Sequence, residues 1–590
     1  MDDNIARLAE LQEKDGAGEK RQKQADVLIG LAGAATLFHT PAPDCDAFAD
    51  IAIDGHRETH RIRGQGVRQW LRHQYFNKTK SGVNSDALQV AVETIVAKAM
   101  FEGAELEVHC RVAEHCGVIY VDIGDPAWRA IKITRSGWAV VADPPVRFAR
   151  SPSMQPLPVP TRGGSIESLR PFCNLSQDGF VLFVATLLAA LRPNSNYPIP
   201  TITGEQGCGK SSLARTLVWL IDPRVPEQRS LPRTEEDLIV AAKSQHVLAF
   251  DNVSGLPDWL SDAVCRLSTG GGAGKRRLYT DEDEVLFSGR RLVALNGIED
   301  VAVRPDLVDR AVMLALEPIA ETARRDEKEF DQELAFAAPK ILGALLDGVV
   351  SGLRDLATIR IADKPRMADC ALWAEVCTRA YWPAGTFLRA YRENIAGAVE
   401  LVLETNAVGD AVRHFMATQS SWQGTASELL PLLTALIPES ASREREWPKR
   451  ADALGGKLRR VAPALRRTGI HIAFDRGDHA RTRIIRIEKR TEARPEHGGK
   501  KASAASAASA AGAKPNEDKQ LDADSRGQRA DTADSVQTVT SAGGVRVNPL
   551  KPHAEDGEDS ADTSLHLSTG NGPVSDVDAV LAELAAQRDI

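Results

Sequence analysis

A glycine-rich segment has the residue types needed to bind a chain of phosphates: Gly204, Glu205, Gln206, Gly207, Cys208, Gly209, Lys210 and Ser211. It follows an apolar run, 199–203, and precedes a predicted helix, which is the setting that the GxxxxGK[ST] pattern requires. The glycines let the backbone wrap around phosphate oxygens, Lys210 reaches the terminal phosphates, and the Ser211 hydroxyl is a ligand for magnesium. With Ser212 next to it, the segment predicts a site for ATP and Mg²⁺, and a chance glycine loop is the alternative.

Two further polar residues come directly after predicted strands. The strand 247–250 ends at Asp251, whose carboxylate would hold the magnesium ion through water. The strand 291–295 ends at Asn296, whose amide would sense the γ-phosphate, whereas a turn asparagine before Gly297 is the alternative. Asn252 stands where many such ATPases carry the glutamate that orients the attacking water. The sequence therefore leaves the catalytic base open.

Two arginines precede a fourth predicted strand, 311–316, in the segment Arg304-Pro305-Asp306-Leu307-Val308-Asp309-Arg310. An arginine at this place could reach the nucleotide of a neighbouring subunit and stabilise charge in the transition state. Arg310 is the first candidate for this role and Arg304 the second. Each could instead form an ordinary surface ion pair.

Three consecutive cations, Lys275, Arg276 and Arg277, lie in a glycine-rich segment that ends at Tyr279. Cations beside an aromatic ring suit a loop that grips a phosphate backbone and stacks on a base. A solvated basic turn would have the same composition. The segment indicates either a nucleic-acid contact or such a turn.

Taken in order, GEQGCGKS, VLAFDN, GKRRLY, VALNG and RPDLVDR resemble the motor domain of superfamily 3 helicases and of the poxvirus-type primase-helicases found in phages and mobile elements. The resemblance covers about 199–319. It implies a P-loop (AAA+) ATPase that forms an oligomeric ring, with a hexamer as the expected size, and acts in DNA replication on single-stranded or forked DNA. It also implies that Lys275, Arg276 and Arg277 contact DNA in the channel of the ring.

The segment 422–490 resembles a winged helix. Its second predicted helix, 451–468, has an apolar stripe of Leu454, Leu458, Val461 and Leu465. The cations left for phosphates or a DNA groove are Lys457, Arg459, Arg460, Arg466 and Arg467. Residues 443–490 contain 15 Lys and Arg against 6 Asp and Glu, a net charge of +9. This charge favours DNA binding over a module that only stabilises the fold.

The periodicity of the whole chain predicts a multidomain α/β protein, because 590 residues exceed what one core supports. In the first domain, 48–62 alternates like a strand. A segment rich in proline and glycine, 151–164, marks a boundary. The predicted parts are a charged segment 1–25, an α+β domain 26–160, the ATPase domain 165–320, a helical lid 321–420, the winged helix 421–490, a disordered acidic tail 491–573 and a short helix 574–590 that could dock on a partner.

Bulk properties indicate a cytoplasmic protein. The first residues are acidic and no apolar run reaches the ~18 residues that span a bilayer, so we expect neither a secretory signal nor a membrane crossing. The eight scattered cysteines suit a reducing compartment. The net charge is -8, but about -7 of it lies after residue 490, so acidity does not exclude nucleic acid as a partner of the folded part.

Three hypotheses for function remain open on the sequence. The first is a ring-forming, DNA-dependent ATPase that translocates on or unwinds DNA. The second is an ATP-controlled DNA-binding switch or loader that does not translocate. The third is a defence or signalling ATPase, whose turnover a ligand other than DNA would stimulate.

Overall fold

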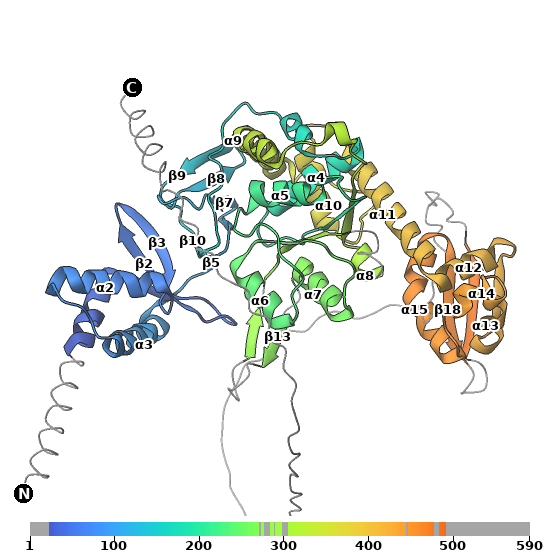
Figure 1. The fold of residues 1–590 in the computed structure, drawn as a ribbon, viewed down its shortest axis with the longest axis horizontal. Coiled ribbons are helices and arrows are strands. Elements are labelled where there is room, and N and C mark those ends of the chain that lie inside the picture. The colour runs from blue at the N-terminus through green and yellow to red at the C-terminus, as the bar shows by residue number, and fades with distance from the viewer. Residues whose placement is uncertain are drawn as a thin grey trace, which may run out of the picture. The chain divides into compact units, whose positions relative to one another are not determined.

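The computed structural model describes residues 23–270, 273–276, 284–287, 289–297, 305–443, 447–476 and 483–490. These residues form a mixed helix and strand chain with several cores, as the sequence predicted (Figure 1). Residues 1–22, the predicted acidic tail and the predicted terminal helix lie outside the described residues.

The first part of the chain has a core of its own, in which the helical residues 23–31 and two further helices pack on a four-stranded sheet of order β3-β2-β1-β4. Its elements are η1 (Ala32–Ala34), β1 (Thr36–His39), β2 (Ala47–Ile53), β3 (His56–Arg61), α2 (Gln65–Thr79), α3 (Ser85–Glu102) and β4 (Ala104–Glu105). The sequence predicted one strand over 48–62, but the structure has a hairpin there. Asp54 and Gly55 both have positive φ, 47° and 81°, and this turn reverses the chain.

A second, antiparallel sheet of order β6-β7-β8-β9 follows. The strands of this region are β5 (Val108–His109), β6 (Val112–His115), β7 (Val118–Asp122), β8 (Ala130–Thr134), β9 (Gly137–Val141) and β10 (Arg147–Phe148). Ile119, Val121 and Ile131 pack in one cluster with the helices of the next region. The cores therefore divide near residue 105, whereas the sequence put a domain boundary near 160. Alternation identifies strands but not the partner on which they pack.

The central sheet is parallel, with strand order β12-β15-β11-β16. Its strands are β11 (Ile199–Thr203), β12 (Val247–Phe250), β15 (Leu292–Asn296) and β16 (Ala311–Ala315). The helical elements in the same stretch of chain are η2 (Ile166–Phe172), α4 (Gln177–Ala190), α5 (Lys210–Ile221), α6 (Glu235–Ser244), α7 (Asp258–Thr269) and α8 (Pro305–Val308).

Helices cover both faces of this sheet (Figure 1). Alternate strand residues divide between two clusters: Val247 and Ala249 pack with α4 and α5, whereas Leu248 and Phe250 pack with α6 and α7. A strand that is buried on both faces reads as a continuous apolar run, which is how the sequence identified it.

Pro200 lies within β11 without breaking the sheet. The pairing of β11 with β15 begins only at Thr201, so the N–H that proline lacks is not needed on that side. On the other side, the N–H of Ile199 donates to the carbonyl of Arg310 at 2.9 Å. The strand is five residues long, and its proline lies where the missing N–H costs no ladder hydrogen bond to β15.

A hairpin is inserted between α7 and β15. Its strands are β13 (Ala273–Arg276) and β14 (Glu284–Phe287), which pair antiparallel with Arg276 opposite Glu284. Lys275 and Arg276 of the basic segment singled out in the sequence therefore lie on the first strand of this hairpin, and the rest of that segment after Arg276 lies outside the described residues.

The region after β16 is helical. Its elements are η3 (Glu321–Ala323), α9 (Glu327–Asp355), α10 (Ala368–Thr378), α11 (Thr386–Thr405) and α12 (Ala407–Ala417). Among the helices that the structure describes, only α9 is long and apolar enough to cross a membrane, and 61% of its apolar window is buried. Ile341, Leu345 and Val349 pack into the central core, so burial inside the protein explains its composition.

The last described part has a three-stranded sheet of order β17-β19-β18. Its elements are β17 (Ser421–Thr425), α13 (Ala426–Thr434), α14 (Glu439–Arg443), α15 (Ala451–Arg467), β18 (Ile470–Arg476) and β19 (Arg483–Lys489). The predicted stripe of α15 is confirmed, because Leu454, Leu458, Val461 and Leu465 are all buried.

Candidate functional site

The glycine-rich loop Gly204–Ser211 connects β11 to α5 and has a backbone that only glycine fits. Gly204 has φ of 144°, and a β-carbon on it would lie 2.8 Å from Cys208 Sγ and 3.0 Å from the carbonyl oxygen of Leu316. Lys210 is the first residue of α5, and its Nζ donates to the carbonyls of Gly204 and Glu205, both at 2.7 Å. The loop thus curls around the end of its own lysine.

Three of the predicted side chains meet beside this loop. Ser211 Oγ lies 3.4 Å from Asp251 Oδ1, and Asn296 Nδ2 lies 3.2 Å from Ser211 Oγ. Asn296 Nδ2 also donates to Asp251 Oδ1. Asp251 and Asn296 follow or end neighbouring parallel strands, β12 and β15, so the sheet brings their side chains to the same edge.

Asn296 is buried, and its Oδ1 has no hydrogen-bond partner within the described part of the chain. A buried amide oxygen without a donor is costly in a folded protein, and such groups call for a functional explanation. Asn252, by contrast, is exposed and has a positive φ of 53°. Its backbone N–H donates to Asp251 Oδ1 at 2.9 Å, which helps to hold that carboxylate.

A further segment, which the sequence did not single out, supports the same residues. The carbonyl of Arg229 accepts from the N–H of Asp251 at 2.9 Å, and Gln228 Nε2 donates to the carbonyl of Ser211 at 2.9 Å. The sequence shows no regular pattern here, because the segment is joined to β12 only through an isolated β-bridge between Arg229 and Phe250.

A cavity of about 500 Å³ opens on the other side of the loop. Gly207, Cys208, Gly209, Ser211 and Ser212 line it together with residues from η2 and from the start of α9. Phe172 and Phe330 form an edge-to-face pair in its wall, with ring centroids 5.4 Å apart. The two rings are far apart in sequence and carry no motif, so only the fold reveals them.

Asn174 fastens the loop to this wall. Its Nδ2 donates to the carbonyl of Cys208 at 3.1 Å and to the carbonyl of Glu317. One side chain therefore joins the glycine-rich loop to the chain that leaves β16.

The predicted arginines of the 304–310 segment are placed differently. Arg304 lies outside the described residues. The side chain of Arg310 is only 13% exposed, and its Nη1 donates to the carbonyl of Asp306 at 2.7 Å. The Arg310 side chain thus folds back on the preceding helix α8 in this chain, and its Nε is buried with no partner among the described residues.

The predicted nucleic-acid residues fall into two groups. Lys275 and Arg276 lie on β13, for which the backbone is described, and Arg277 lies outside the described residues. In α15, Arg467 pairs with Asp309 at 2.6 Å, and the Arg459 guanidinium lies 4.7 Å from the centre of the Phe474 ring. For Lys457, Arg460 and Arg466, the described residues provide no carboxylate partner. These three cations remain available for an external ligand.

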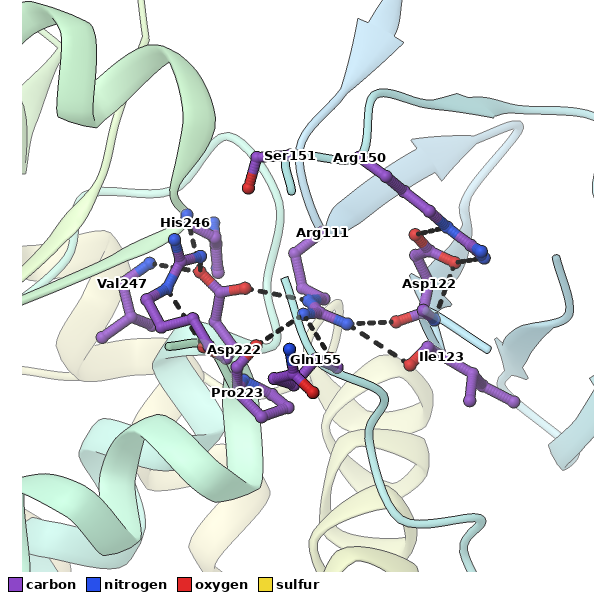
Figure 2. Close-up of polar contacts among 12 residues, drawn as sticks. Arg111, Asp122, Ile123, Arg150, Ser151, Gln155, Asp222, Pro223, His246 and Val247 are labelled. Atoms are coloured by element: carbon purple, nitrogen blue, oxygen red, sulfur yellow. Dashed lines mark hydrogen bonds and ion pairs between the residues drawn. The ribbon is translucent and has the colours of Figure 1, made fainter. Parts of the chain in front are cut away.

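A buried ionic network anchors the far end of α5. Figure 2 shows Asp222, the C-cap residue of that helix, facing Arg111 from the β5–β6 connection. Arg111 Nε donates to Asp222 Oδ1 at 2.9 Å, and neither side chain has any exposed surface. Asp222 Oδ2 also accepts from Arg224 and from the backbone N–H groups of His246 and Val247.

This environment shifts two pKa values. Burial alone would raise the pKa of Asp222, but the charges of Arg111 and Arg224 outweigh it and hold this pKa below its usual value. Burial lowers the pKa of His246 to about 4, so its ring is neutral near pH 7. The network therefore places one buried carboxylate between two buried guanidiniums, and it joins the second sheet to the helix that begins at the glycine-rich loop.

Comparisons with protein families identify two parts of the chain. Residues 166–397 match the model of the actinomycete integrative conjugative element replication protein, AICE_RepA. Residues 408–506 match the model of the AICE RepA C-terminal domain. Together the two matches cover more than half of the chain and contain the glycine-rich loop, Asp251, Asn296 and α15. No curated protein sequence matches significantly.

Solved structures offer similarities at low identity. The SCCmec type IV Cch active helicase is 12% identical, with 77% of this chain and 93% of that chain covered and a TM-score of 0.40. The C-terminal region of NrS-1 is 12% identical, with 79% and 99% covered and a TM-score of 0.34. A full-length MCM homologue from Methanopyrus kandleri is 11% identical, with 62% and 75% covered and a TM-score of 0.23. Scores below 0.5 do not establish a common fold.

Proposed function

We propose that this chain, which belongs with the replication proteins of integrative conjugative elements, is an ATP-hydrolysing motor that acts on DNA. The observation that carries the proposal is the meeting of Ser211, Asp251 and Asn296 within 3.4 Å beside the glycine-rich loop. A hydroxyl, a carboxylate and an amide at the end of a phosphate-binding loop are the groups needed to hold a metal ion and to sense the terminal phosphate.

The residues at the loop fit ATP with magnesium. Ser211 and Asp251 supply the hard oxygen ligands that Mg²⁺ prefers, and Gly204 leaves no room for a β-carbon where the backbone must approach phosphate. Magnesium, when bound, neutralises charge on the phosphates. Lys210 Nζ can exchange the carbonyls of Gly204 and Glu205 for phosphate oxygens. Asn296 holds Asp251 and Ser211 in register, and its free Oδ1 can accept from the attacking water.

The proposed fold of residues 165–320 is a P-loop core of the AAA+ type. Its support is the parallel strand order β12-β15-β11-β16, with the loop after β11 and the two polar residues after or at the end of β12 and β15. The proposed fold of residues 421–490 is a winged helix, supported by the element order β17, α13, α14, α15, β18, β19. In that fold α15 is the recognition helix.

Two surfaces support DNA as the substrate on which the motor acts. The hairpin β13–β14 carries Lys275 and Arg276, and α15 presents Lys457, Arg460 and Arg466, which no described carboxylate neutralises. Cations of this kind bind phosphates without regard to base sequence. We further propose that the protein works in the cytoplasm as a ring of identical subunits, because a DNA motor of this type encloses its strand.

The decisive experiment measures oligomeric mass and ATP turnover with and without single-stranded DNA. We expect an oligomer whose turnover DNA stimulates, and strand displacement on a forked duplex. Lys210→Ala should abolish both activities because it removes the charge that reaches the phosphates. A monomer whose turnover is indifferent to DNA would refute the motor.

Asn252 favours a second candidate, an ATP-controlled DNA switch or loader. An exposed amide follows Asp251 where a carboxylate base would be expected, and an amide cannot take a proton from water. This candidate predicts retention on DNA that depends on ATP, with slow turnover and no strand displacement. Displacement at a rate that exceeds spontaneous melting would exclude it.

A further inference from the structure

Three arginines line the cavity beside the glycine-rich loop: Arg215, Arg324 and Arg325. Two of them are neutralised by carboxylates. Arg215 pairs with Glu327 at 2.6 Å and with Asp331 at 3.2 Å. Arg325 pairs with Glu333.

Arg325 is also fixed in the wall of the cavity. Its Nη1 donates to the carbonyl of Pro171 at 3.1 Å, and its guanidinium lies 5.4 Å from the centre of the Phe330 ring. A carbonyl, a carboxylate and an aromatic face together occupy this side chain, so it has little capacity left for a ligand.

Arg324 differs from both. Its side chain is exposed and makes no hydrogen bond or ion pair with any residue in the described ranges. It lies against the loop: a β-carbon placed on Gly207 would be 3.4 Å from Arg324 Nη2 and 3.7 Å from its Cζ. Gly207 has φ of 82°, a conformation that glycine adopts without strain.

We infer that Arg324 binds the phosphate chain of the nucleotide held by its own subunit. The inference rests on the proposed function and names a further residue of that site. A guanidinium without a counter-charge beside a phosphate-binding loop is matched to phosphate oxygens, which it can bind through two parallel N–H donors. In this cavity it is the one arginine with both a free charge and a place at the loop.

The lining of the cavity also indicates which phosphates Arg324 contacts. Gly207, Ser211 and Ser212 line the cavity, whereas Asp251 and Asn296 do not. Arg324 therefore reaches the loop from the side away from Asp251 and Asn296, the residues assigned to the metal ion and the terminal phosphate. It contacts the phosphates nearer the nucleoside, so ADP and ATP depend on it equally.

The test measures binding of ADP, ATP and inorganic tripolyphosphate by the full chain, with displacement of a fluorescent ADP analogue as the readout. The variants are Arg324→Gln, Arg324→Lys and the control Lys328→Gln, an exposed cation nearby that does not line the cavity. We expect Arg324→Gln to weaken all three ligands about tenfold or more, because it removes the charge-assisted hydrogen bonds of the guanidinium. Arg324→Lys should lose less, and the control should match the wild type.

The outcomes separate the inference from the function on which it rests. A wild type that binds no ADP would overturn the proposed function itself. If the wild type binds ADP and Arg324→Gln binds within twofold of it, only the role of Arg324 is overturned. A loss for ADP without a loss for tripolyphosphate would mean that Arg324 contacts the base, and a loss for ATP alone would put it at the terminal phosphate. Either result contradicts the inference, and equal unfolding midpoints of wild type and variant exclude misfolding as the cause.

Discussion

Asp222→Asn is expected to destabilise the central region of the protein although it removes no atom from the core. Asp222 is the counter-charge of two buried guanidiniums, those of Arg111 and Arg224. Asparagine keeps the shape but leaves both positive charges without a partner. It also turns an N–H₂ group either towards the backbone N–H donors of His246 and Val247 or towards Arg111.

The magnitude follows from this geometry. Breaking a buried ion pair by neutralising one partner costs about 3 to 5 kcal/mol, because an uncompensated charge remains in a medium of low polarity. We expect about 4 kcal/mol here. At about 2 to 4 °C per kcal/mol for a unit of this size, the unfolding temperature of the central region should fall by about 10 °C.

Scanning calorimetry of the full chain measures this effect, and Asp178→Asn is the matched control. Asp178 forms a two-pronged pair with Arg389, at 2.6 and 2.8 Å, but both side chains are substantially exposed. An exposed pair contributes about 0 to 1 kcal/mol, so the control should shift the transition by no more than a few degrees. Equal shifts for the two variants would refute the reasoning, since burial would then not decide the cost.

Three further predictions follow from the site and its surroundings. The free energy of unfolding should fall by about 3 kcal/mol as the pH drops from 6.5 to about 4. The reason is that His246 has a lowered pKa of about 4 in the folded chain, so the unfolded chain binds its proton at a higher pH. Urea titrations at several pH values, in wild type and His246→Gln, check this expectation. Asp251→Asn should reduce ATP turnover at least about a hundredfold while ADP still binds, which steady-state kinetics and a binding titration measure together. Reversing the charge of Arg460 and Arg466 should weaken DNA binding and reduce its dependence on salt. Arg467→Glu should instead mainly lower stability, because it places a second carboxylate beside Asp309. Fluorescence anisotropy of labelled DNA at two salt concentrations separates a loss of DNA binding from a loss of stability.

Local sequence patterns account for the parts of the candidate site that the sequence predicted. The glycine-rich loop is contiguous, and its glycines, lysine and serine act through their own backbone and immediate neighbours. Asp251 and Asn296 follow or end apolar strands, and parallel strands bring such positions to one edge of a sheet. The buried stripe of α15 was visible for a related reason, since a helix repeats its apolar face every three or four residues.

Other features had no local signal. The turn at Asp54 and Gly55 interrupts an alternation that continues on both sides of it, so a hairpin was read as one strand. The sheet β6-β7-β8-β9 alternates normally, yet its apolar side chains share a core with α4 and α9. Which surface a strand covers depends on how distant segments pack.

The sequence by itself predicted where phosphates and a metal ion would bind and which residues would form the apolar stripe of α15, because these predictions depend on residue type and short-range period. Only the tertiary structure decided which arginines form ion pairs within the described part of the chain and which do not. Arg467 looked like its neighbours on α15 until Asp309 was found 2.6 Å away, and Arg324 looked like any surface arginine until it was found beside Gly207. An ion pair between residues far apart in the sequence produces no recognisable sequence pattern, because its energy depends on the distance between the charges in space and on their burial.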